Sequence, residues 1–164
     1  MIWNFGDIFD ALLEVLPKEH PALIHGSRAI SWGELDRRSN NLVQSMYKNG
    51  AQAGDRVCFY MRNRSEYMET LIACFRGRLT HVNVNYRYVA EEIKYIFENS
   101  DANVVVYAEE FRKTITAVQH QLPNVKQWIE IADNMYFPKH PEKKIFLQQD
   151  GFLDKTLTYA SSLS

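Results

Sequence analysis

Glycine is scarce in the second half of this chain. Of seven glycines among 164 residues, only Gly151 follows Gly77. Loops that hold the phosphates of ATP or of a dinucleotide need several glycines, because backbone without Cβ atoms lets several N–H groups converge on one anion. There is no Walker-type loop, no GxGxxG after a strand and no Ser/Thr/Gly-rich run followed by Pro-Lys-Gly. This absence argues against ATP turnover or dinucleotide binding by these residues.

Cysteine, net charge and long apolar runs are also limited. The two cysteines, Cys58 and Cys74, lie in apolar segments without ligand spacing, which favours buried free thiols over a metal site or a disulfide. A formal net charge of -1 predicts neither nucleic acid nor an anionic membrane as a partner. No apolar run approaches the ~18–20 residues that a membrane span needs, and the acidic start does not look like a signal peptide. We therefore expect a cytoplasmic protein without a membrane span.

The hydrophobic pattern is that of an α/β domain. Apolar or alternating runs that are typical of strands occur at 57–61, 80–85, 103–108 and 125–131. Helical periodicity falls between them, at 90–99, at 110–122 and ahead of Gly77. The inner face of the helix that ends at Gly77 is expected to carry Met68, Leu71, Ile72 and Phe75. This alternation predicts a mostly parallel sheet with helices on both faces.

The two ends of the chain differ from this alternation. Ahead of it we expect a helix at 5–16, a small hairpin around residues 25–28, and a helix that starts at Ser31 with Glu34 completing a capping box. Asn63 or Ser65 is the expected cap of the helix that follows the first strand. From about residue 133 the sequence reads as a linker or weakly ordered tail. The predicted domains are therefore an α/β subdomain at 1–132 and a tail at 133–164.

The loop at 85–88 (Asn-Tyr-Arg-Tyr) is the best candidate for a ligand site. It follows the carboxyl end of a predicted parallel strand, where ligands of open α/β sheets gather. Arg87 offers a fork of donors that suits a phosphate. The competing interpretation is that Asn85 stabilises the turn and Arg87 forms a surface ion pair with Glu91 or Glu92.

Acidic pairs and aromatic residues near this loop have structural explanations. Glu91-Glu92 and Glu109-Glu110 stand at helix starts, where carboxylates favour the positive end of the helix dipole, so we interpret both pairs as solvated caps. Four aromatic residues follow in the sequence, and a packed seam explains them more simply than a ligand platform does. They are Tyr86, Tyr88, Tyr95 and Phe97.

Several segments occur in an order that resembles a known family. They are PALIHGSRAISWGELDRRSNNL at 21–42, Gly-Asp-Arg-Val at 54–57, Met-Arg-Asn at 61–63, Asn-Tyr-Arg at 85–87 and Asn-Ser-Asp-Ala at 99–102. Together they resemble the N-terminal region of AMP-forming acyl-CoA synthetases of the adenylate-forming ligase superfamily, over residues 5–131. Within this superfamily, the segments are most similar to those of fatty-acyl-CoA ligases.

The resemblance implies a two-step reaction. A carboxylate and ATP, assisted by Mg, give an acyl-adenylate, and the CoA thiol then displaces AMP. The family's catalytic residues lie further along the chain, so no catalytic or metal-binding residue is transferred here, and we expect no cofactor to be bound by this chain alone. In some relatives the arginine of the Asn-x-Arg loop reaches the CoA nucleotide phosphate, which implies that role for Arg87. The implied partner is the remainder of a ligase chain.

The sequence also departs from the family. Arg78 stands where a small residue is usual, Asn83 and Tyr86 stand where prolines are common, and the stretch from about Pro138 does not lead into the family's next segment. A stand-alone α/β module that binds a ligand or oligomerises, for instance as a homodimer, without catalysis is therefore the alternative.

The shortage of glycine generates the first prediction. The chain of 164 residues will not catalyse ATP–pyrophosphate exchange with any fatty acid, because it lacks a loop that can hold the ATP phosphates. Isotope exchange is measured against a heat-inactivated control. Exchange above that control would contradict the argument.

Overall fold

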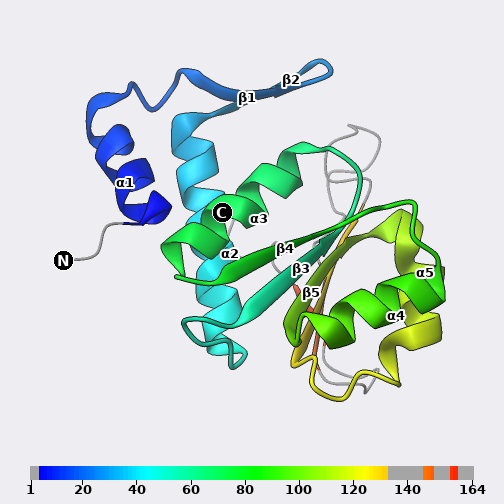
Figure 1. Ribbon diagram of the computed structural model, residues 1–164. Coiled ribbons are helices and arrows are strands. Elements are labelled where there is room, and N and C mark those ends of the chain that lie inside the picture. The colour runs from blue at the N-terminus through cyan, green and yellow to red at the C-terminus, as the bar shows by residue number, and fades with distance from the viewer. Residues whose placement is uncertain (1–3, 133–145, 150–155, 159–164) are drawn as a thin grey trace. The chain divides into compact units, whose positions relative to one another are not determined.

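The computed structural model describes residues 4–132, 146–149 and 156–158, with the elements labelled in Figure 1. The chain groups into two compact units. One consists of Met1–Gly54 and Asn63–Thr80, and the other of Asp55–Arg62 and His81–Ser164.

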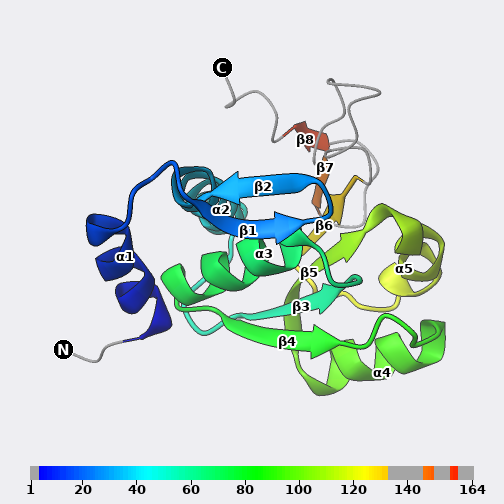
Figure 2. The same ribbon diagram turned by 90° about the horizontal axis from the view of Figure 1, so that it is seen from above.

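The first unit contains three helices and a hairpin. Its elements are α1 (Phe5–Val15), β1 (Pro21–His25), β2 (Arg28–Ser31), α2 (Trp32–Lys48) and α3 (Ser65–Arg76). Strands β1 and β2 run antiparallel (Figure 2). Gly26 takes a φ of +62° in the turn between them, which a residue without a Cβ atom adopts at little cost. The predicted hairpin is therefore confirmed.

The helix starts differ in part from expectation. Ser31 caps α2 as predicted, since its Oγ accepts from the Glu34 N–H at 3.2 Å. The reciprocal half of the capping box is absent, because the Glu34 carboxylate accepts from Arg28 at 2.8 Å instead. Helix α3 has no side-chain cap, since its N-cap residue is Arg64, and Ser65 is already its first helical residue. The prediction that Asn63 or Ser65 caps this helix is wrong.

Arg76 joins the three helices of the first unit. Its guanidinium donates to Asp10 of α1 at 2.5 Å and lies 2.7 Å from an Asp36 carboxylate oxygen of α2. It also donates to Ser39 Oγ at 3.2 Å and stacks 4.8 Å above the Phe9 ring. One side chain at the end of α3 thus holds both other helices.

The buried face of α3 is more polar than its periodicity predicts. Glu66 and Glu69 are almost completely buried, whereas Met68, which we expected to face inward, is exposed. Each acid has a cation: Arg64 Nε donates to Glu66 at 2.9 Å, and Arg38 donates to Glu69 at 2.8 Å. Each buried acid is thus paired with an arginine, as buried charged groups generally are.

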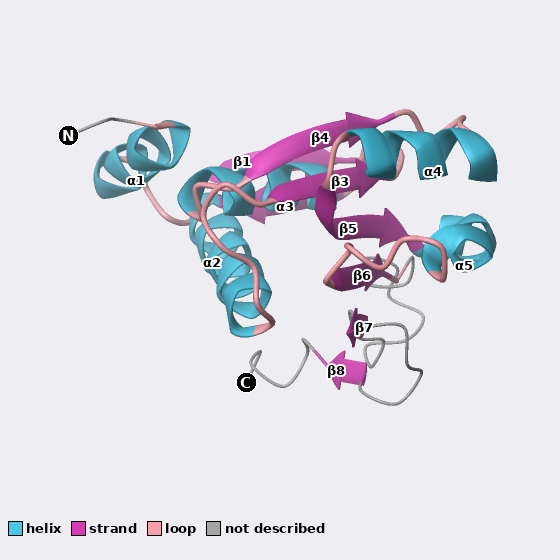
Figure 3. Ribbon diagram, turned by 60° about the horizontal axis from the view of Figure 1, so that its bottom comes forward, coloured by secondary structure: helices cyan, strands magenta, loops and turns pink. Residues whose placement is uncertain are grey.

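The second unit is built on a sheet with the strand order β4-β3-β5-β6-β7-β8 (Figure 3). Its strands are β3 (Arg56–Tyr60), β4 (Thr80–Val84), β5 (Ala102–Ala108), β6 (Gln127–Ile131), β7 (Phe146–Gln149) and β8 (Thr156–Thr158). The first four strands are parallel, and β7 and β8 continue the sheet antiparallel. Its helices are α4 (Ala90–Asn99), the 3-10 turn η1 (Glu109–Phe111) and α5 (Arg112–Gln119).

Helices α4 and α5 pack beside each other over this sheet (Figure 1). Their buried side chains, with those of the strands, form a core that includes Cys58, Tyr60, Val84, Ile93, Phe97, Val105, Tyr107, Ile115, Val118 and Trp128. Trp128 and Phe97 meet edge to face with ring centroids 6.1 Å apart, a favourable arrangement for aromatic rings.

Most sequence expectations agree with this fold. The α/β class, the mostly parallel sheet flanked by helices and the small hairpin are confirmed. Cys58 and Cys74 are buried free thiols, and burial raises the pKa of Cys58 to about 11. Most of the predicted tail at 133–164 lies outside the described residues. The two short strands described there, β7 and β8, were not predicted, and a domain boundary near residue 132 stays a prediction.

The contact between α1 and α3 generates the second prediction. A Cβ atom at Gly6 would lie 2.8 Å from the Phe75 carbonyl oxygen and 2.9 Å from Arg76 Cα. Gly6→Ala should therefore lower the free energy of unfolding by about 1–3 kcal/mol, as overpacking does, although alanine favours a helix more than glycine. Urea unfolding measures the change.

Glu14→Ala is the control for that variant. Glu14 is exposed on the same helix, so its removal should change the free energy of unfolding by less than about 0.5 kcal/mol. A Gly6→Ala chain as stable as the parent would contradict the close packing of α1 on α3.

Candidate functional site

The candidate site lies at one edge of the parallel sheet in the second unit. Strands β3 and β5 pair in register, with Tyr60 opposite Tyr107. The segments that follow these two strands therefore leave the sheet at the same edge, and the loop after β4 leaves it there too, because carboxyl ends of parallel strands share an edge. This brings together residues near positions 62, 86 and 110.

The turn after β4 is held by its own hydrogen bonds. Asn85 Oδ1 accepts from the Arg87 N–H at 3.0 Å, and the Tyr88 N–H donates to the Asn85 carbonyl at 3.0 Å. The Tyr60 hydroxyl donates to the Tyr88 carbonyl at 2.6 Å, and burial raises the pKa of Tyr60. The expected role of Asn85 is present, and the turn is tied to β3 as well.

The Arg87 side chain is exposed at this turn. Its guanidinium carbon lies 5.3 Å from the centroid of the Tyr86 ring. Among residues 81–132, no ion pair joins it to Glu91 or Glu92. Glu92 instead accepts from the Val89 N–H at 2.8 Å and caps α4, as the sequence predicts. Arg87 thus presents its donors to solvent.

A second arginine reaches the same ring. Arg62, two residues past the end of β3, has its guanidinium carbon 4.6 Å from the Tyr86 centroid. Its Nε–H donates to both carboxylate oxygens of Glu110, at 3.0 and 3.2 Å, and this hydrogen bond raises the pKa of Arg62. Sequence reasoning missed Arg62 and interpreted Glu110 as a cap, which is wrong. The aromatic residues do not form one seam either, because Tyr95 is exposed while Tyr86 supports two arginines.

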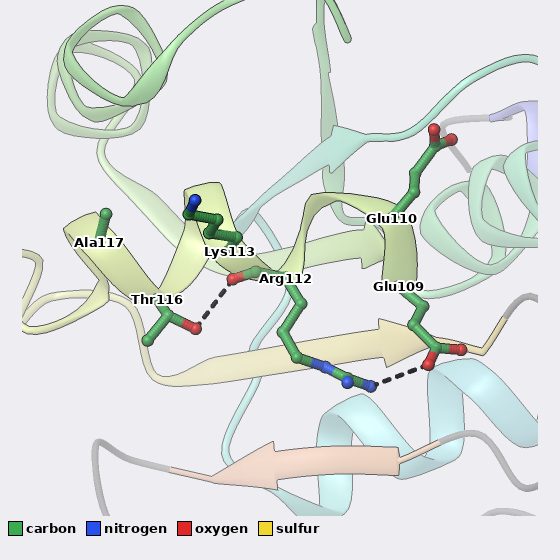
Figure 4. A pocket seen from close by; sticks show the side chains of 6 residues that line it. All are labelled: Glu109, Glu110, Arg112, Lys113, Thr116 and Ala117. Atoms are coloured by element: carbon green, nitrogen blue, oxygen red, sulfur yellow. Dashed lines mark hydrogen bonds and ion pairs between the residues drawn. The ribbon is translucent and has the colours of Figure 1, made fainter.

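An open pocket of about 590 Å³ borders Glu110 on η1 and α5 (Figure 4). It is lined by Glu109, Glu110, Arg112, Lys113, Thr116 and Ala117. Glu109 accepts from Arg112 at 3.2 Å. Both acids lie in the first turn of η1, as the sequence predicts, but η1 has no side-chain cap hydrogen bond. The Glu110 side chain points away from Lys113 in Figure 4. The pocket therefore contains the Lys113 cation next to two acids that are already paired with arginines, Glu109 with Arg112 and Glu110 with Arg62.

Arg112, the first residue of α5, is bonded to Glu130 of β6. Its Nε–H donates to Glu130 at 2.7 Å, and a second nitrogen of the guanidinium binds the other oxygen of the same carboxylate. The Glu130 side chain is only 8% exposed. This hydrogen bond raises the pKa of Arg112, while burial, with Glu130 beside it, raises the pKa of Tyr107. The Arg112–Glu130 pair is thus structural.

The arrangement suits an anion with several oxygens. Arg62 and Arg87 supply two guanidinium groups on one tyrosine, and both are accessible from solvent. Guanidinium forks match the geometry of a phosphate, and stacking on an aromatic face holds them in place. Within the described part of the chain, no group of three His, Cys, Asp or Glu side chains is placed to hold a metal ion.

The family follows from a comparison with known families. A model of the family described as AMP-binding enzyme matches residues 9–163. The chain belongs to the AMP-binding enzyme family. No helix among its described residues has both the length and the apolar character required to cross a bilayer.

The curated relatives are CoA ligases. The chain is 33% identical over 133 residues to a 3-oxocholest-4-en-26-oate–CoA ligase of Rhodococcus rhodochrous. The matched residues make up 81% of this chain and 24% of the relative. It is 30% identical over 130 residues to a medium/long-chain-fatty-acid–CoA/3-oxocholest-4-en-26-oate–CoA ligase of Mycobacterium marinum, again over 24% of that protein. The chain thus spans about a quarter of the length of these relatives.

A solved structure has the same fold. The fatty acyl CoA synthetase of Mycobacterium tuberculosis superposes with a TM-score of 0.72 at 23% identity, over 78% of this chain and 26% of that one. At this identity the likeness shows the fold alone. It confirms that the sheet and its helices are arranged as in acyl-CoA synthetases.

The two ion pairs at the sheet edge generate the third prediction. Arg112→Ala should lower the free energy of unfolding by about 2–4 kcal/mol, because it leaves the buried Glu130 carboxylate without its cation. Arg62→Ala is the matched control and should lower the free energy of unfolding far less, because its pair with Glu110 is exposed. Urea unfolding of both variants gives the comparison. Equal losses would contradict the distinction between a structural and an exposed pair.

Proposed function

We propose that this chain forms part of an ATP-dependent acyl-CoA ligase. The reaction is the formation of an acyl-adenylate from a carboxylate and ATP, followed by transfer of the acyl group to the CoA thiol. Membership of the AMP-binding enzyme family and the CoA-ligase relatives support this proposal. The chain alone is inactive in this proposal, because a glycine-rich phosphate loop is absent from its sequence.

The substrate class follows from the same relatives. They are named for medium- and long-chain fatty acids and for a sterol-derived carboxylic acid, both of which are large and apolar. We propose a fatty or similarly apolar carboxylic acid as the acyl substrate. ATP, Mg and CoA are the cofactors in this proposal, and the remainder of a ligase chain supplies the residues that bind ATP and Mg. Use of these metabolites is consistent with a cytoplasmic location.

The role proposed for the described residues is to hold a phosphate of the CoA nucleotide through Arg87. The observation that carries this role is the exposed guanidinium on a turn fixed by Asn85 at the carboxyl edge of the sheet. Ligands of open α/β sheets bind outside this edge. A rigid backbone with a free guanidinium limits the ordering entropy that phosphate binding costs.

The fourth prediction tests this role in the complete ligase. Arg87→Ala should raise the KM for CoA about 10- to 100-fold and leave the KM for ATP unchanged, because a charge-assisted hydrogen bond contributes roughly 1.5–3 kcal/mol. Steady-state kinetics with each substrate varied in turn measures the two constants.

Arg37→Ala is the matched control. Arg37 is exposed on α2, and its removal changes the net charge equally, so neither KM should change. An unchanged KM for CoA in Arg87→Ala would contradict the role of Arg87, and an equal rise for CoA and ATP would indicate a general loss of structure.

A further inference from the structure

We infer that Arg62, Tyr86 and Arg87 form one anion-binding unit for a nucleotide phosphate, and that Glu110 is its resting counterion, which the phosphate displaces. This inference rests on the proposed function and adds three residues to it. It also assigns Glu110 a regulatory effect, since the acid competes with the ligand for Arg62.

Tyr86 is the centre of this unit. The guanidinium carbons of Arg62 and Arg87 lie 4.6 and 5.3 Å from its centroid. Both are within the ~6 Å at which a cation is attracted to an aromatic face. Because the distances share one centroid, the two cations lie no more than about 10 Å apart, within one Debye length at ordinary salt. Two cations this close attract a dianion more strongly than either does alone.

Glu110 occupies the position that an anion would take on Arg62. Both of its carboxylate oxygens accept from the Arg62 Nε–H, which satisfies part of the fork that a phosphate would use. Arg87 has no such partner among the described residues, so the unit carries two cations and one bound carboxylate. The local charge therefore remains positive while Glu110 is in place.

The Arg62–Glu110 pair is easy to break. The side chains are 57% and 34% exposed, so water replaces their contact at little cost. Arg112 at the same edge differs, since its partner Glu130 is buried and cannot be released without losing its compensation. Of Glu110 and Glu130, only Glu110 belongs to an exposed ion pair, so it is the carboxylate that an incoming phosphate can displace.

Other charges around the unit do not replace Glu110. Glu92 is bound to the Val89 N–H, and Glu109 is bound to Arg112. Glu91 stands beside Glu92 at the start of α4 and forms no ion pair with Arg87 in the described residues. Displacement of Glu110 thus leaves the phosphate near two guanidinium groups that no carboxylate of the described residues neutralises.

The test uses adenosine 3′,5′-bisphosphate as the probe and isothermal titration of the full chain at low ionic strength. At pH 7.5 its phosphate monoesters are close to dianions. Glu110→Gln should tighten binding about five-fold, the effect of removing one competing charge at ~4 Å in water. Adenosine, which has no phosphate, should not bind in either chain. Weaker or unchanged binding of the bisphosphate by Glu110→Gln overturns the inference, as does undetectable binding by both chains.

A double-mutant cycle assigns the effect to the pair. The gain from Glu110→Gln should disappear when Arg62→Gln is also present, because Arg62 is the group that Glu110 occupies. Glu98→Gln is the charge control, since it makes the same change in net charge near the other end of α4 and should leave affinity unchanged. A gain that persists without Arg62, or that Glu98→Gln reproduces, overturns the role of the pair.

The platform role of Tyr86 has its own readout. Tyr86→Ala should weaken binding several-fold and Tyr86→Phe clearly less, because the ring face attracts both cations while the hydroxyl interacts with Arg62 alone. Equal loss in both variants contradicts that role.

Titration with inorganic phosphate distinguishes the ligand source. If Glu110→Gln tightens the binding of inorganic phosphate but not of the bisphosphate, the nucleotide assignment is overturned.

These outcomes separate this inference from the proposed function. If Arg87→Ala raises the KM for CoA but Glu110→Gln and Arg62→Gln leave bisphosphate binding unchanged, the CoA role of Arg87 stands and the three-residue unit fails. If the binding changes occur and the KM for CoA does not move, the anion site stands and its assignment to CoA fails.

Discussion

The parallel pairing of β3 with β5 is the constraint on which the candidate site depends. With Tyr60 opposite Tyr107, the chain leaves both strands at one edge of the sheet. Arg62 and Glu110 are 48 positions apart in the sequence, yet each lies only two or three residues beyond that register pair. A shift of one residue in either strand would turn the side chains that follow it to the other face and separate the ion pair.

The same edge combines a rigid base with exposed donors. Tyr60 illustrates the link, since its ring belongs to the buried core and its hydroxyl holds the Tyr88 carbonyl of the turn that carries Arg87. The buried Arg112–Glu130 pair fixes the start of α5 to β6 in a comparable way. Burial therefore determines where the exposed Arg62 and Arg87 stand, and their own interactions with Tyr86 only orient the guanidinium groups. Core packing and the proposed anion recognition thus depend on one arrangement.

The sequence could predict what depends on periodicity and on local chemistry. Strand runs, helix stripes and the turn at Gly26 are local. The rule that ligands gather at carboxyl ends of parallel strands selected Arg87 as a candidate, and its role stays a prediction. Pairing between distant charges has no periodic signal. The burial of Glu69 depends on Arg38, 31 residues away, and so appears as a polar interruption in the stripe of α3. Glu110 was misread for the same reason, since a carboxylate at a helix start looks like a cap until its distant partner is known.

Proteins bind phosphate either through backbone N–H groups of a glycine-rich loop or through cationic side chains, and this edge of the sheet has arginines and no glycine-rich loop. A glycine-rich loop binds phosphate through converging backbone N–H groups, which needs a particular loop conformation and is independent of side-chain charge. Here the N–H groups of Arg87 and Tyr88 are bonded within the turn, to Asn85, and the exposed donors of this edge are arginine side chains. Side-chain cations on exposed stems can be neutralised by a nearby acid, as Arg62 is by Glu110, and a backbone cradle cannot. An arginine site is therefore open to competition from within the protein, which makes its affinity adjustable by a single carboxylate.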